Sequence, residues 1–85
     1  MVYKTIKPRK YVNSDNYYYD IIRKNIKKYR SNSHLTQQDL ADMTDLSREY
    51  ISDIENEKRN KHFTISVLGR IAEALDIDIK EFFND

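Results

Sequence analysis

The stretch Thr36–Asn56, TQQDLADMTDLSREYISDIEN, decides how this chain folds, because it predicts two short helices joined by a tight turn. Leu40 and Ala41 form the inner face of the first of these helices, and Ala41 is small enough for another helix to approach closely. In the second, Ile51 and Ile54 recur at the spacing of one helical face. Both helices therefore have a side that must pack against other parts of the chain.

The other side of the second helix is polar. Arg48, Glu49, Ser52 and Asp53 lie between its apolar positions, and all four side chains can form hydrogen bonds. A helix that is held from behind and shows such residues in front is the layout of a DNA-reading helix-turn-helix.

Capping residues set the ends of the expected helices. The segment Thr36–Asp39, TQQD, has the form of a capping box, so its helix begins at Gln37 and runs to about Met43. The other expected N-caps are Asn13 or Ser14 for a first helix, Ser47 for the third, Thr64 for the fourth and Asp78 for a short fifth. The first helix is expected to end near Arg30, and the third near Asn56.

Apolar stripes indicate that all of these helices share one core. The stripe of the first helix consists of Tyr18, Ile22, Ile26 and Tyr29, and that of the fourth consists of Ile65, Leu68, Ile71, Ala72 and Leu75. Helices with one apolar face are not stable alone and must pack together. The sequence therefore predicts an all-α fold: a compact five-helix domain over residues 14–85, preceded by a basic arm over residues 1–13.

Length and composition exclude several classes of protein. The 85 residues are enough for one domain with a modest core, and the chain has no cysteine for a disulfide framework or a thiolate metal site. It contains no apolar run of membrane-spanning length and no signal-peptide core. We expect a soluble, cytoplasmic protein without a membrane partner.

The net charge of +1 conceals a strong asymmetry along the chain. Residues 1–35 carry nine basic and two acidic residues, hence +7, whereas residues 36–85 carry six basic and twelve acidic residues, hence −6. A basic first third favours a polyanion or an acidic protein as partner. The alternative is that these charges merely solvate a small domain.

Catalysis has little support in the sequence. His34 and His62 fall in expected loops, without the paired spacing of metal ligands. The chain also lacks a glycine-rich phosphate cradle and a nucleophile elbow. We therefore predict no enzyme activity, no metal, no cofactor and no small-molecule ligand.

The order of these features resembles the Cro/CI-like family of helix-turn-helix regulators, also called the XRE family. The matching segments are Leu35-Thr36-Gln37, Leu40-Ala41, Tyr50-Ile51-Ser52 and Ile54-Glu55-Asn56, followed by Lys58, the apolar stripe of the fourth helix and Phe82. The resemblance covers about residues 20–83. It implies a compact five-helix domain that binds operator DNA as a two-fold dimer.

The resemblance also implies roles for individual residues. The positions that face the major groove are Ser47, Arg48, Glu49, Ser52 and Asp53. Gln37, Asn56 and Lys58 match positions that contact the DNA backbone. Arg30 and Glu55 match a pair that forms a salt bridge between the first and third helices.

Four positions where the family often has glycine hold other residues here: His34, Asp45, Glu57 and Asp76. Asp tolerates the left-handed backbone region better than most residues, so the turns at Asp45 and Asp76 remain feasible. Glu57 in addition places a carboxylate where a phosphate would approach.

The chemistry of the reading helix supports DNA recognition. A guanidinium such as that of Arg48 can bond both O6 and N7 of guanine, unless it pairs with the nearby Asp45. The carboxylates of Glu49 and Asp53 repel phosphate. Either one of them accepts a hydrogen bond from cytosine N4, or the two contribute by excluding wrong DNA sequences. The loop cations Lys58, Arg59 and Lys61 are candidates for a phosphate clamp.

These observations favour a sequence-specific DNA-binding regulator, a repressor that binds an inverted repeat in double-stranded DNA as a homodimer. Phe82 and Phe83 are the candidate dimer contacts, unless both are buried within the monomer. The arm bases Lys4, Lys7, Arg9 and Lys10 would follow the DNA backbone or enter a minor groove, or the arm would instead complete the dimer. The rival is an antitoxin-like protein-interaction module on the same fold, suggested by the acidic reading face.

Overall fold

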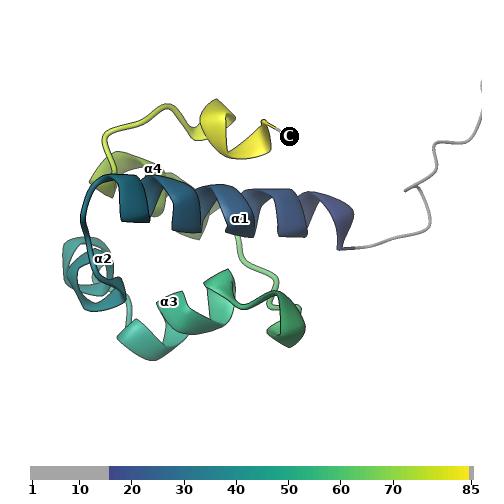
Figure 1. Ribbon diagram of the computed structural model, residues 1–85, viewed down its shortest axis with the longest axis horizontal. Helices are drawn as coiled ribbons and strands as arrows, with labels where there is room; N and C mark the ends of the chain where they lie inside the picture. Colours follow the sequence, from purple (N-terminus) through teal and green to yellow (C-terminus); the bar gives the residue numbers. More distant parts are fainter. Residues whose placement is uncertain (1–15, 85) are drawn as a thin grey trace, which may run out of the picture.

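The computed structural model describes residues 16–84, so the basic arm over 1–13 and the expected caps Asn13 and Ser14 lie outside the described residues. The helices are α1 (Tyr17–Asn32), α2 (Gln37–Thr44), α3 (Arg48–Glu55) and α4 (Ile65–Ala74), with the 3-10 turns η2 (Glu57–Arg59) and η3 (Ile79–Phe83) (Figure 1). Residues 16–84 contain no strand, which confirms the all-α class. The expected fifth α-helix is the shorter 3-10 turn η3.

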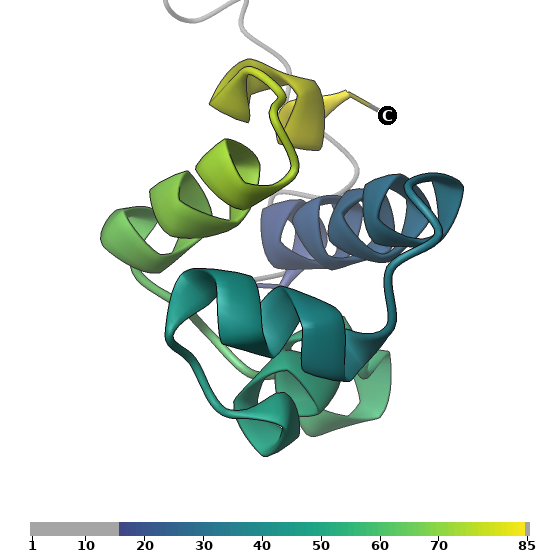
Figure 2. The same ribbon diagram turned by 90° about the vertical axis from the view of Figure 1, so that its left-hand side faces the viewer.

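Helix α1 separates two parts of the fold. The unit formed by α2, α3 and η2 lies on one side of α1, and η3 lies on the other (Figure 1). Helix α4 runs beside α1 and contacts both α2 and η3 (Figure 2). Within residues 16–84, no helix is long and apolar enough to cross a membrane.

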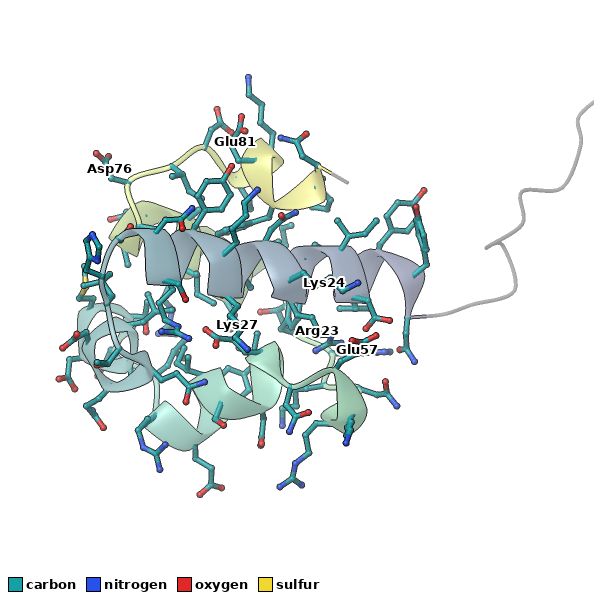
Figure 3. All side chains as sticks on the ribbon, viewed as in Figure 1. Arg23, Lys24, Lys27, Glu57, Asp76 and Glu81 are labelled. Carbon is teal, nitrogen blue, oxygen red and sulfur yellow. The ribbon has the colours of Figure 1, made fainter. Side chains whose placement is uncertain are left out.

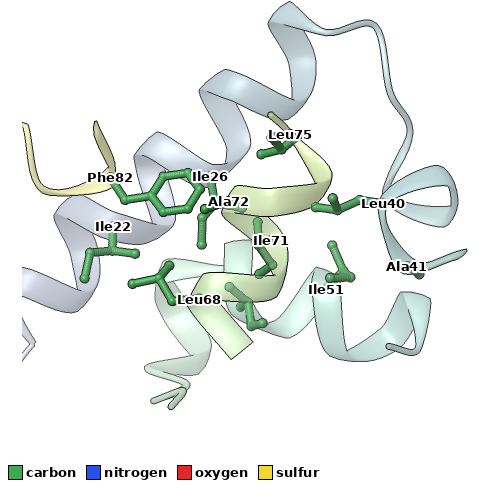
Figure 4. Packing of buried hydrophobic residues seen from close by; sticks show 11 residues of the cluster. Ile22, Ile26, Leu40, Ala41, Ile51, Leu68, Ile71, Ala72, Leu75 and Phe82 are labelled. Atoms are coloured by element: carbon green, nitrogen blue, oxygen red, sulfur yellow. The ribbon is translucent and has the colours of Figure 1, made fainter. Parts of the chain in front are cut away.

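The core fills the space between these elements (Figure 4). Its buried apolar side chains are Ile22, Ile26, Leu40, Ala41, Ile51, Ile54, Leu68, Ile71, Ala72, Leu75 and Phe82. Each large aliphatic or aromatic side chain that is fully buried contributes about 1.5–3 kcal/mol relative to its exposed state. Because every helix supplies part of this cluster, the helices hold one another in place.

Two residues of the predicted stripes are not in the core. Tyr18 is 51% exposed and Ile65 is 69% exposed. Tyr18 lies in the first turn of α1, and Ile65 is the first residue of α4. These first turns extend beyond the packed centre, so the helical period continues there without a neighbour to cover it.

The predicted N-cap residues lie at the starts of the short helices. The Thr36 hydroxyl accepts from the Asp39 N–H at 3.0 Å and the Asp39 carboxylate accepts from the Thr36 N–H at 2.8 Å, which completes the capping box. The hydrogen bond from the Thr36 backbone N–H to the charged carboxylate is the main cause that lowers the pKa of Asp39 below its ordinary value of 3.8. Ser47, Thr64 and Asp78 likewise accept backbone N–H groups at the starts of α3, α4 and η3.

Left-handed backbone conformations occur at three of the four positions where the family often has glycine. His34, Asp45 and Asp76 have φ values of 59°, 58° and 55°. Glu57 does not adopt this conformation, because it begins the turn η2; the left-handed residue after α3 is Asn60, with φ 50°. Asparagine adopts this region more readily than most residues do.

Two buried polar side chains of α1 bind the backbone of other elements. Arg23 is 1% exposed; it donates to the Ile54 carbonyl at 2.7 Å and to the Lys61 carbonyl at 3.1 Å. Asn25 donates to the Phe82 carbonyl at 2.7 Å. Neither role was anticipated from the sequence, where Arg23 counts only as one more positive charge. In the fold, it holds the end of α3.

Candidate nucleic-acid interface

The five candidate base-reading residues lie together along α3. Ser47, Arg48 and Glu49 are exposed at its start, and Ser52 and Asp53 are half-buried one turn later. Among the described residues, the side chain of Arg48 forms no hydrogen bond or ion pair, so the alternative pairing with Asp45 is absent. The guanidinium of Arg48 is therefore available at the surface.

Asp53 has a partner that sequence reasoning missed. The Nε atom of Arg59 lies 3.6 Å from a carboxylate oxygen of Asp53. Asp53 lies in α3 and Arg59 lies in η2, and the turn η2 brings the two side chains together in space. The pair reduces the repulsion that the Asp53 carboxylate would exert on phosphate, and it directs Arg59 toward the reading face.

The opposite side of α3 is fixed to α1 by the predicted partners Arg30 and Glu55. Arg30 Nε and Nη2 donate to the two Glu55 oxygens at 2.7 Å and 2.9 Å, and Nη1 donates to the Leu35 carbonyl at 2.7 Å. The hydrogen bonds to the Glu55 carboxylate raise the pKa of Arg30 above its ordinary value. Gln37 Nε2 donates to the same carboxylate at 3.1 Å, so the start of α2 joins the junction.

A groove of about 800 Å³ lies between α1, the start of α2, the end of α3 and η2. The backbone-contact candidates Gln37, Asn56 and Lys58 all line it. Arg59 and Lys61 do not, because Arg59 pairs with Asp53 and the Lys61 ammonium lies 5.2 Å from the centre of the Tyr50 ring. The five phosphate candidates are thus divided between two places.

The groove has further polar walls. Glu57 lines it. Arg23, Lys24 and Lys27 of α1 line its other side (Figure 3). The sequence counts Lys24 and Lys27 only among the positive charges of residues 1–35, since the helical period does not show which element lies across from them.

A second hollow, of about 240 Å³, is apolar. It is lined by Tyr18, Tyr19, Ile22, Phe63, Thr64, Ile65, Leu68 and Phe83. Phe83 is 45% exposed here, whereas Phe82 is completely buried against α1 and α4. Phe82 is therefore a core residue and was wrong as a candidate dimer contact; only Phe83 remains one.

The chain matches known proteins over most of its length. The family model described as "Helix-turn-helix domain" matches residues 24–85. Control protein C.SmaI of Serratia marcescens is 35% identical over 60 residues, which is 71% of this chain and 69% of that protein.

Solved structures of restriction-modification controller proteins have the same fold. C.Esp1396I is 34% identical with a TM-score of 0.70, and the match covers 79% of this chain and 84% of that one. The same protein has also been solved bound to a 25-base-pair operator site, again with a TM-score of 0.70. C.AhdI from Aeromonas hydrophila is 25% identical, with a TM-score of 0.70 over 76% of this chain and 96% of that one.

The family model spans the turn between α2 and α3, the base-reading candidates on α3 and the groove beside them. The chain therefore belongs to the helix-turn-helix domain family, as a Cro/CI-like regulator of transcription and not an enzyme.

Proposed function

We propose that this protein is a sequence-specific regulator that binds an inverted-repeat operator in double-stranded DNA as a homodimer and represses transcription there. The observation that carries the proposal is the polar outer face of α3, with Arg48 unpaired, next to a groove lined by backbone-contact candidates. The operator complex of the similar protein C.Esp1396I supports it.

In this proposal α3 enters the major groove. Arg48 reads a guanine through two hydrogen bonds, and Glu49 accepts from cytosine or excludes other bases. Gln37, Asn56 and Lys58 contact phosphates, which fix the position of the helix without carrying sequence information. The proposed DNA-binding domain spans residues 14–85, with residues 1–13 as an additional basic arm.

The homodimer is proposed to form through the apolar hollow beside η3. Tyr18, Ile65 and Phe83 are exposed large apolar side chains, and all three line this hollow. Such a cluster on a small domain favours a protein contact. Two copies related by a two-fold axis would place their α3 helices on half-sites about 34 Å apart, one turn of DNA.

The dimer contact is tested by Phe83→Glu, which places a charge at this surface. We expect the variant to sediment as a monomer and to remain folded, because Phe83 is already half exposed. Met43→Glu is the matched control, since Met43 is similarly exposed but lines a separate depression near the α2–α3 turn. A Phe83→Glu protein that remains dimeric would rule this interface out.

The function itself is tested by selecting genomic DNA fragments with the purified full chain and titrating the best site at two salt concentrations. An enriched inverted repeat, bound far more tightly than random DNA, would support the regulator and supply the operator; a reporter placed behind that operator then measures repression. Uniform binding that disappears with salt would reflect phosphate attraction only. That outcome would favour the antitoxin-like alternative, which the carboxylates Glu49 and Glu57 near the reading face also suggest.

A further inference from the structure

The α1 side of the groove between α1 and α3 contains lysines to which no function has yet been assigned. Lys24 and Lys27 are three residues apart on α1, so they lie on one face of that helix. Both are exposed and point away from the α1 axis (Figure 3). Both line the groove together with Gln37, Asn56 and Lys58. The reading helix and α1 therefore present polar side chains to the same space.

The ionised groups in the groove differ in availability. Arg23 is buried and bonded to backbone carbonyls, and Glu55 is bonded to Arg30 and Gln37. The ammonium groups of Lys24, Lys27 and Lys58 and the carboxylate of Glu57 remain, and in the described part of the chain none of the four is in an ion pair. These four groups sum to two positive charges, so the groove attracts an anion.

The neutral lining suits a phosphate. Asn56 uses its side-chain oxygen to accept from the Lys58 N–H, which leaves its amide nitrogen to donate. Ser52 lines the groove and also belongs to the base-reading set, so the groove opens directly beside the reading face. A duplex that holds α3 in its major groove would bring its backbone to this opening.

We propose that Lys24 and Lys27 bind phosphates of the DNA backbone, with α1 forming the second wall of a groove that receives one strand. This inference rests on the proposed function and adds α1 to the DNA-binding surface. The two lysines also offset the repulsion from Glu57. Each phosphate that a lysine neutralises adds about 0.9 to the slope of log affinity against log salt.

The test compares two double variants that lose the same charge. Lys24→Gln/Lys27→Gln removes the α1 wall. The control, Lys28→Gln/Lys80→Gln, removes two exposed lysines that do not line the groove; the Lys28 ammonium lies instead 5.1 Å from the centre of the Tyr29 ring. Affinity for the selected operator and for a random duplex is measured at several salt concentrations, together with the melting temperature.

For the groove variant we expect the salt slope to fall by about 2 and the affinity to fall about tenfold on both duplexes, at an unchanged melting temperature. The control variant should keep the wild-type slope. Equal slopes for the two variants would overturn the inference, because only net charge would then matter. If the wild type preferred no DNA sequence, the proposed function would fail first, and that outcome is distinct from an unchanged slope with intact operator binding.

Discussion

Helix α3 has two faces that use the same kinds of side chain differently. On the inner face, the Arg30–Glu55 pair is bidentate, with a shortest distance of 2.7 Å and side chains that are 12% and 3% exposed. On the outer face, the Asp53–Arg59 pair has a single contact of 3.6 Å, with side chains that are 27% and 67% exposed. The inner pair is removed from water and geometrically fixed, whereas the outer pair can exchange its partner. We therefore expect the inner face to control stability and the outer face to control binding.

The largest effect is expected for Glu55→Ala on the inner face. The substitution leaves the guanidinium of Arg30 without its partner and Gln37 without its acceptor, so the free energy of unfolding should fall by about 3 kcal/mol. Denaturant unfolding measures this loss. The exposed neighbour Glu49→Ala on the same helix is the control, with an expected change within about 0.5 kcal/mol.

Glu55→Ala should leave the preferred DNA sequence unchanged when binding is measured below the melting temperature. An altered consensus site in a protein of unchanged stability would show that Glu55 belongs to the reading surface and would remove the distinction between the two faces.

The converse effect is expected for Arg48→Ala on the outer face. Loss of the two hydrogen bonds to guanine should cost about 2 kcal/mol of sequence preference per half-site, with little change in stability. Arg48→Lys sharpens the test, because it keeps the charge but not the planar fork, so it should retain affinity for random DNA while losing preference. Preference that survives both substitutions would move base recognition elsewhere on α3.

A smaller effect is expected for Arg59→Ala, which removes the outer pair. Because Arg59 is exposed, Asp53 is only half-buried and their contact is loose, the free energy of unfolding should change by about 0.5 kcal/mol or less. DNA affinity should fall, since the Asp53 carboxylate then faces phosphate without compensation. A stability loss comparable to that of Glu55→Ala would contradict the proposed difference between the faces.

The smallest effect on stability is expected at the start of α2. Gln37 in this first turn both bonds Glu55 and lines the groove. Hydrogen bonds from Thr36 lower the pKa of Asp39 below 3.8, so the charged form stabilises the fold above that value and the contribution is lost as the pH falls through the lowered pKa. Thr36→Ala removes the hydroxyl but keeps the backbone N–H that bonds the carboxylate, so it should return the pKa of Asp39 only part of the way toward its ordinary value in an NMR titration. A complete return would assign the shift to the hydroxyl and not to the backbone N–H.

The local features of the fold could be predicted from the sequence. The capping box at Thr36 and the caps Ser47 and Thr64 were confirmed, since a cap is a contact between residues two or three positions apart. The left-handed turns at Asp45 and Asp76 follow from the same local logic.

The predictions failed where a residue's surroundings come from distant parts of the chain. Periodicity placed Tyr18 and Ile65 in the core, but it does not show where the neighbouring helix ends. The left-handed turn at Asn60 had no sign in the sequence, because it follows from the 3-10 turn that Asn56 caps after α3.

The sequence by itself determined the helices, their caps and the apolar faces, because these depend on contacts within one or two helical turns. Only the tertiary structure decided which charges are structural and which are available for binding. Arg23 and Lys24 are adjacent in the chain, yet one is buried against the carbonyls of Ile54 and Lys61 and the other lines an open groove. Their difference arises from a rotation of about 100° around α1, which turns one side chain into the core and the other to water.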